Sequence, residues 1–226
     1  MIKEIIDKLV ALLAVSALLA SCSESELWQN PQTEARDGYI MLNFKTEIPA
    51  MQEVVTRAVD PDGGGVQDMT LFCFDSYGLF ISTVKAGVTV QKPGPGEMEG
   101  TFKAEVPENT RTIHFLANQN MDEFKEDSFR NKSESEVMAV LEGSSGRMIY
   151  WGRFACDAGN DSNIAEQMAT SGNSVKLIRN HARISVDNPD NNGHIVITGF
   201  AVCNTNAFGT VAPHHPKKGF DFTWPS

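Results

Sequence analysis

The chain has 226 residues, with 19 lysines and arginines against 29 aspartates and glutamates, and its formal net charge at pH 7 is −10. An acidic chain without a basic cluster is poorly suited to a phosphate backbone, so this composition excludes nucleic acid as a partner. The length is sufficient for one large domain or two small ones, with a full hydrophobic core.

The first feature in chain order is an uncharged, mainly apolar run from Leu9 to Ala20, which leads into Leu19-Ala20-Ser21-Cys22. The run is shorter than the roughly 20 apolar residues of a bilayer span and is typical of a signal peptide. Its end resembles a bacterial lipobox. We therefore expect residues 1–21 to be a lipoprotein signal peptide and Cys22 to receive acyl chains, which anchor a protein to a membrane. The alternative is an ordinary secretory signal with a chance cysteine.

Residues 22–37 are polar, include Pro31 and contain few apolar side chains, so they predict a flexible tether. The tether begins with Ser23-Glu24-Ser25-Glu26, which places two carboxylates directly after the expected lipid anchor. In lipoproteins of the Bacteroidota, an acidic segment at this place resembles a signal for export to the cell surface.

Residues 38–48 are the first expected strand. Apolar side chains recur at alternate positions and polar ones lie between them, a period of two that is typical of a strand with one buried face. The side chains expected on the buried face are Ile40, Leu42, Phe44 and Ile48. Pro49 ends the strand, and a polar segment with Thr56-Arg57-Ala58 follows.

Further strand candidates recur about every ten residues, separated by segments rich in turn-forming residues. They are residues 66–75, 79–90, 100–106, 111–117, 148–154, 175–187 and 195–204. This spacing predicts a mainly β fold, an antiparallel β-sandwich. In residues 175–187 the apolar positions change parity, which a β-bulge near residues 179–181 would explain, and we expect Ile184 and Val186 to face the core.

One or two short helices interrupt the strands. Ser133 and Glu136 have the spacing of a capping box, and apolar residues at Val137, Val140 and Leu141 follow at helical intervals. A second short helix is expected over residues 164–169.

No spacing of cysteines or acidic residues predicts an active site or a metal site. Cys73, Cys156 and Cys203 lack the paired spacing of a zinc site or a disulfide framework, and we expect Cys73 and Cys203 to be buried thiols. Asp60-x-Asp62-Gly63 begins like a calcium loop, but Leu71 occupies the position at which such a loop needs glutamate.

The histidines point the same way. His114, His181 and His194 are scattered singly, and His214 and His215 are expected in a solvated, proline-flanked tail. We therefore expect no enzymatic activity, no catalytic residues, no cofactor and no bound metal.

Several further motifs occur in a distinctive order. They are Thr56-Arg57-Ala58, Leu71-Phe-Cys-Phe-Asp75 with Gly78-Leu-Phe80, Arg111-Thr-Ile-His-Phe-Leu-Ala-Asn118, Val175-x-Leu177-x-Arg179-x-x-Ala182-Arg183-Ile184, and Val202-x-Asn204 with Gly209-x-Val211-x-Pro213. With the lipobox and the first strand, this order over residues 19–213 resembles the type V pilus fimbrillin family of the Bacteroidota. The resemblance implies a transthyretin-like Greek-key β-sandwich over residues 38–213, with residues 214–226 as a short tail. The second sandwich of the family and its C-terminal strand are missing, which separates this chain from subunits that donate a strand.

The resemblance also implies a mechanism of assembly. In such fimbrillins an arginine-specific surface protease removes the lipidated N-terminal segment with its strand, and a strand from a neighbouring subunit fills the groove. Here the cut falls between Arg57 and Ala58, and residues 38–48 are the detachable strand. The implied partners are other fimbrial subunits, the protease and the outer membrane, and the implied location is a fimbria at the cell surface.

A second hypothesis from a different class is a surface lipoprotein whose sandwich binds a glycan or a host ligand. Trp28, Trp151 and Trp224 would then be exposed platforms for the ligand. A patch of coplanar exposed aromatic side chains favours this second hypothesis, whereas a groove filled by residues 38–48 favours fimbrial assembly.

Overall fold

The structure is a computed structural model that describes residues 35–48, 65–89, 99–143, 148–180, 198–199, 201, 203 and 209–223. All of these residues belong to the unit that begins at Ala35. Within these ranges, no helix has the length and apolar character needed to cross a membrane.

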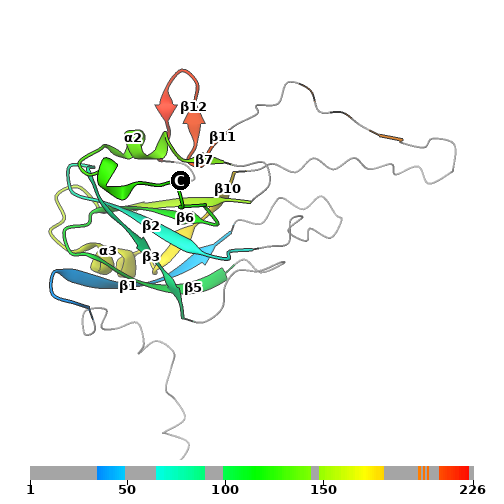
Figure 1. Cartoon of the computed structure of the whole chain (residues 1–226). Helices are drawn as coiled ribbons and strands as arrows, with labels where there is room; N and C mark the ends of the chain where they lie inside the picture. The colour runs from blue at the N-terminus through cyan, green and yellow to red at the C-terminus, as the bar shows by residue number, and fades with distance from the viewer. Residues whose placement is uncertain are drawn as a thin grey trace, which may run out of the picture. The chain divides into compact units, whose positions relative to one another are not determined.

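A four-stranded sheet has the order β4-β5-β1-β9. β1 (Tyr39–Glu47) and β5 (Glu99–Pro107) pair antiparallel over their whole lengths. At one edge β4 (Gly87–Val88) pairs antiparallel with β5, and at the other β9 (Ser174–Lys176) pairs parallel with β1. Figure 1 shows β1 and β5 side by side in one layer of the molecule.

A five-stranded sheet has the order β10-β8-β6-β2-β3, and every neighbouring pair in it is antiparallel. Its strands are β2 (Met69–Phe74), β3 (Phe80–Lys85), β6 (Thr112–Ala117), β8 (Tyr150–Ala155) and β10 (Ile178–Arg179). The mainly β, largely antiparallel sandwich that the sequence predicts is confirmed. The Greek-key, transthyretin-like connection of its strands stays a prediction.

The two sheets enclose the main hydrophobic core. Phe44 and Phe102 contribute from the four-stranded sheet, and Leu71 and Phe115 contribute from the five-stranded sheet, all of them fully or almost fully buried. Alternate residues of each strand point into this core because successive side chains of a strand point to opposite faces.

The five-stranded sheet is also buried on its second face. Phe72 and Leu116 point away from the main core into a second cluster, where they meet Val137 and Val211. All residues of β2 and β6 are therefore buried, and their sequences, MTLFCF and TIHFLA, lack a regular polar alternation. Figure 1 shows α2 and β12 on this side of the sheet, opposite the layer of β1 and β5.

Short elements build the layer over this second face. They are the 3₁₀ helix η2 (Glu126–Ser128), α2 (Glu134–Met138), β7 (Glu142–Gly143), β11 (Gly209–Thr210), β12 (His214–His215) and β13 (Gly219–Phe220). β7 pairs with β11 and β12 pairs with β13, both antiparallel. The expected solvated tail is thus wrong for residues 214–220, which form a small hairpin, although both histidines of β12 are exposed.

Both predicted helices are present and capped. The side chain of Ser133 accepts from the backbone N–H of Glu136, whose carboxylate accepts from Ser133 in return, so the predicted capping box is confirmed. α3 (Ile164–Thr170) begins with the same arrangement between Asn163 and Glu166. One expectation fails: α2 ends before Val140, whose side chain is 51 % exposed.

Two predicted strands are divided between the sheets. The segment 79–90 forms β3 in the five-stranded sheet and then β4 in the four-stranded sheet. The segment 175–187 forms β9 and then β10, which also belong to different sheets. The change of parity in this segment therefore arises where the chain crosses between sheets at Leu177, and the expected bulge is wrong for the described residues.

Gly152 on β8 makes this crossing possible. A Cβ atom at this position would lie 2.7 Å from the backbone oxygen of Lys176 and 2.8 Å from a methyl carbon of Leu177. Contacts this short are repulsive, so the close approach of the crossing segment to β8 requires glycine.

The last predicted long strand, residues 195–204, is not supported where the chain is described. Residues 198, 199, 201 and 203 are not in a strand, and the remaining residues of this segment lie outside the described ranges. Cys203 is exposed, so the expectation of a buried thiol there is wrong, whereas Cys73 on β2 is buried as expected.

Candidate functional site

The candidate site is the groove that β1 fills, between β5 on one side and β9 on the other. The inward side chains of β1 are buried, with exposures of 7 % for Ile40, 1 % for Leu42, 0 % for Phe44 and, just past the strand, 5 % for Ile48. The alternation in the sequence predicts this facing correctly. Each of these side chains occupies the core between the two sheets, so β1 contributes one row of that core.

Phe44 is the largest side chain that β1 places in the groove. Its ring stacks on Phe102 of β5 at a centroid distance of 5.7 Å and meets the edge of Phe115 of β6 at 5.0 Å. Both are favoured arrangements of aromatic pairs. Phe44 thus touches both sheets and is the main side-chain anchor of β1.

Main-chain pairing holds β1 unequally along its two edges. Towards β5 the register is continuous, from Tyr39 opposite Pro107 to Glu47 opposite Glu99. Towards β9 only Lys45, Thr46 and Glu47 are paired, and in the described part of the chain no strand pairs with this edge of β1 over residues 39–44.

The end of β1 near residue 47 is bound most tightly by hydrogen bonds. The backbone N–H of Lys45 donates to the oxygen of Asn173 at 2.6 Å, and the N–H of Leu177 donates to the oxygen of Glu47 at 2.7 Å. The hydroxyl of Ser174 also donates to the Glu47 carboxylate at 2.6 Å. The groove therefore holds the strand from both sides at this end and from one side at the other.

A surface contact holds the beginning of β1. The backbone N–H and the guanidinium Nε of Arg36 both donate to the carboxylate of Glu105 on β5, at 2.6 Å and 2.7 Å. These bonds, the backbone one first, hold the pKa of Glu105 below its usual value. Arg36 also lies over the ring of Tyr39, 4.4 Å from its centre. Because the contact is exposed, we expect it to add little to the stability of the strand.

The segment that follows the expected cleavage point is anchored by Asn118. Val66 is fully buried, and the backbone N–H of Gln67 donates to the Asn118 side-chain oxygen at 2.7 Å. The Asn118 side-chain nitrogen donates to the backbone oxygens of Gly65 and Met148, at 2.7 Å and 3.0 Å. Asn118 has a φ of 63°, a left-handed conformation that asparagine tolerates better than most residues. The chain is therefore held firmly from Gly65 onward.

Several predicted site residues lie outside the described residues, and the structure does not place them. They are the lipidation site Cys22, the processing site Arg57 and Ala58, the aromatic candidates Trp28 and Trp224, the histidines His181 and His194, and the expected core residues Ile184 and Val186. Residues 49–64, which contain the processing site, connect the buried Ile48 to Gly65.

The structure brings together a polar cluster that sequence reasoning missed. His114 on β6 is fully buried, and its Nε2 lies 2.6 Å from the carboxylate of Glu134 on α2. Arg153 on β8 donates to both oxygens of this carboxylate, at 2.7 Å and 3.2 Å. Trp151 Nε1 donates to His114 Nδ1 at 3.1 Å, and Phe222 lies edge-on to the imidazole.

The tautomer of His114 follows from its neighbours. An indole N–H only donates, so Nδ1 of His114 is an acceptor and Nε2 carries the proton that is donated to Glu134. Burial lowers the pKa of His114 and outweighs the opposing hydrogen bond to Glu134. Partial burial alone would raise the pKa of Glu134, but hydrogen bonds from His114 and Arg153 reverse this and bring it to about 2. The cluster thus joins a neutral imidazole to an ion pair.

This cluster fits a structural role. Both ring nitrogens of His114 are engaged by groups of the core, so neither faces a position where a reactant would lie. Glu134 instead ties the first turn of α2 to β6 and β8 across the second face of the sheet. Trp151 is fully buried, so the expectation that it is an exposed ligand platform is wrong.

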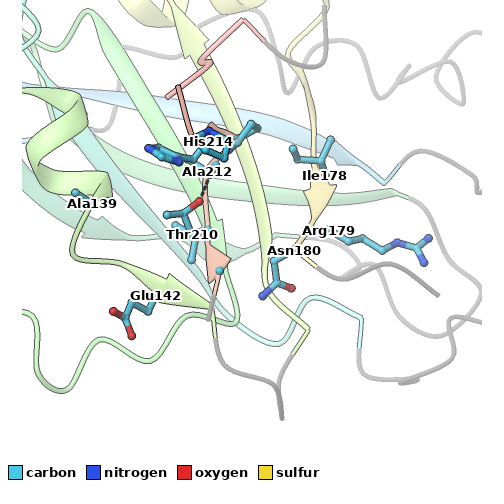
Figure 2. Close-up of a pocket in the computed structure, with 12 residues that line it drawn as sticks. Ala139, Glu142, Ile178, Arg179, Asn180, Thr210, Ala212 and His214 are labelled. Atoms are coloured by element: carbon cyan, nitrogen blue, oxygen red, sulfur yellow. Dashed lines mark hydrogen bonds between the residues drawn. The ribbon is translucent and has the colours of Figure 1, made fainter. Parts of the chain in front are cut away.

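A cavity of about 530 Å³ opens between the end of α2, β10 and residues 209–216. Figure 2 shows Ile178 and Asn180 on one side and Thr210, Ala212 and His214 on the other. The charged side chains at its rim, Glu142 and Arg179, point away from each other. The lining does not place several polar groups around a common point, which is what a specific small-molecule site requires.

The described residues contain no group of three or more histidine, cysteine or acidic side chains with metal-binding geometry. Comparisons with models of protein families, with curated proteins and with solved structures find no match for this chain. The groove of β1 is therefore the site whose geometry supports a specific function most directly.

Proposed function

We propose that the chain is a structural or accessory subunit of a cell-surface fimbria, exported as an outer-membrane lipoprotein and assembled by strand exchange. In this proposal Cys22 carries the lipid anchor, and an arginine-specific protease cuts between Arg57 and Ala58. The N-terminal segment then leaves with β1, and a strand from another subunit takes its place in the groove.

The observation that supports this proposal is the way β1 is bound. The strand contributes a row of buried apolar side chains and is joined to the rest of the domain by the pairing of an extended strand on β5. An added strand gains affinity from main-chain hydrogen bonds and specificity from pockets for alternate side chains, and β1 uses both. A groove without a strand would leave apolar surface and unpaired backbone groups exposed, which favours refilling.

The anchoring of the chain on each side of residues 49–64 also supports a cut in this segment. The preceding residue, Ile48, is buried with β1, and the following residues are held by Asn118 and by burial of Val66. A cut at Arg57 therefore divides the chain between two independently anchored ends. The domain beyond Gly65 keeps its own contacts when β1 departs.

Limited digestion with an arginine-specific protease tests the cleavage step. We expect the first cut in the folded protein to fall after Arg57, ahead of Arg111 and Arg179, which are half-buried in or beside strands. The variant Arg57→Ala should lose this first cut. Arg130→Ala is the matched control, since Arg130 is exposed in a turn, and it should leave the cut at residue 57 unchanged.

Mass spectrometry of the fragments over time distinguishes the outcomes. Early cuts within the strands, with Arg57 spared, would reject strand exchange and favour the alternative, a surface lipoprotein that binds a glycan or a host ligand. A first cut at Arg57 that leaves the domain folded supports the proposal.

A further inference from the structure

We infer that Thr46 weakens the hold of the groove on β1, and that the strand which replaces β1 bears an aliphatic side chain at this position. The inference rests on the proposed strand exchange and adds the chemistry of the incoming strand. It concerns the inward position of β1 that follows Phe44, at the end where the strand is paired on both sides.

Thr46 is the polar exception among the inward positions of β1. Its side chain is 0 % exposed, and it shares the buried face with Leu42, Phe44 and Ile48. Within the part of the chain that the structure describes, its hydroxyl oxygen has no hydrogen-bond partner. A hydroxyl group that gives up water without finding another partner is unfavourable.

The neighbours of Thr46 offer little to its hydroxyl. In the sheet, Thr46 lies opposite Gly100 of β5, which has no side chain, and beside Val175 of β9, which is apolar. Val175 is 3 % exposed and belongs to the same core cluster as Phe44 and Ile48. The surroundings of Thr46 on the inward face are therefore suited to a methyl group.

Valine has almost the shape of threonine and replaces the hydroxyl with a methyl group. Removing a buried unpaired hydroxyl in this way gains about a factor of ten in the equilibrium, within a range of roughly 5- to 100-fold. A strand with valine or isoleucine here would therefore displace β1 even if its other contacts were the same. The direction of exchange then follows from one residue of the resident strand.

The other pockets define the rest of the incoming strand. The positions of Ile40 and Leu42 take aliphatic side chains, and the position of Phe44, between Phe102 and Phe115, takes an aromatic ring. The occupant that fits is an extended segment of another subunit with an aliphatic, aliphatic, aromatic, aliphatic pattern at alternate positions. The outward positions of β1 are polar or partly exposed and set little constraint.

Competition between peptides tests this preference. The full chain, with the recognition sequence of a sequence-specific viral protease placed within residues 50–64, is cut and then mixed with labelled peptides of residues 38–48. Three peptides are compared: the natural sequence, Thr46→Val and Phe44→Ala. We expect the Thr46→Val peptide to replace β1 at about one-tenth of the concentration that the natural peptide needs, and the Phe44→Ala peptide to fail.

The outcomes separate the inference from the proposed function. Exchange of the natural peptide with no advantage for Thr46→Val would overturn the inference and leave strand exchange standing. Failure of every peptide to enter would overturn strand exchange and, with it, the assigned partner.

A measurement on the intact chain tests the weakening itself. Thr46→Val should raise the ratio of folded to unfolded protein about tenfold in urea unfolding, whereas Thr101→Val should leave it nearly unchanged. Thr101 is a suitable control because it lies on the outward face of β5, opposite Lys45. Equal stability of Thr46→Val and the natural chain would contradict the role assigned to Thr46, whatever the peptides do.

Discussion

Replacing Phe44 with alanine tests whether β1 is held mainly through its side chains. Phe44 is fully buried, stacks on Phe102 and meets the edge of Phe115. The alanine variant loses the transfer free energy of the ring and leaves a cavity between the two sheets, because neither strand can close over it. Changes of this kind destabilise proteins by about 3–5 kcal/mol.

The two aromatic contacts place the expected loss in the upper part of this range, at about 4 kcal/mol. For a domain of this size each kcal/mol lowers the melting temperature by roughly 2–4 °C, so we expect a decrease of about 8–16 °C. Urea unfolding and a thermal melt of the intact chain measure the two quantities. Asn43→Ala is the matched control, because Asn43 is the neighbouring outward position of β1, and its cost should stay within about 0.5 kcal/mol.

A loss below about 1 kcal/mol for Phe44→Ala would refute the reasoning, since the groove would then collapse over the missing ring without penalty. A comparable loss for Asn43→Ala would also refute it, because the effect would belong to the strand backbone rather than to the buried face.

Three further predictions concern other parts of the chain. Because His114 is buried as the neutral form with a lowered pKa, unfolding takes up a proton below about pH 6.5, so stability in urea should fall from pH 7 to pH 5 and fall less in His114→Gln. Asn118→Ala leaves the partners in Gly65 and Met148 unpaired and should cost about 3 kcal/mol, whereas a loss of a few tenths would show that Asn118 is no anchor. Labelling of cells with an acyl-chain probe should mark the natural protein and not Cys22→Ala, and equal labelling would exclude the lipid anchor.

Local signals made part of this fold predictable. The alternation of Ile40, Leu42 and Phe44 sets the facing of β1, because a strand reverses its side chains at each residue. The capping box of Ser133 and Glu136 similarly marks the start of α2, because both partners lie within one turn of the chain. In each case the sequence contains both members of the interaction within a few residues.

Contacts between distant segments were not predictable in this way. His114, Glu134 and Arg153 come from three separate elements, and no spacing in the sequence indicates that they meet. The continuous apolar sequences of β2 and β6 do indicate burial on both faces, which is the signal that a third layer covers the second face. The change of parity near Leu177 fits either a bulge or a crossing between sheets, and the position of Gly152 decides for the crossing.

The central claim is that β1 leaves the groove after the chain is cut and that another strand enters. Two preparations of the full chain, one with the natural isotopes and one labelled with ¹⁵N, are cut at Arg57, mixed below the melting temperature and followed by native mass spectrometry. Strand exchange predicts hybrid particles that combine a light domain with a heavy N-terminal fragment, and none in uncut or Arg57→Ala mixtures. Complete cutting without hybrids over several days at 37 °C would contradict the claim, because β1 would then be a permanent part of the sandwich.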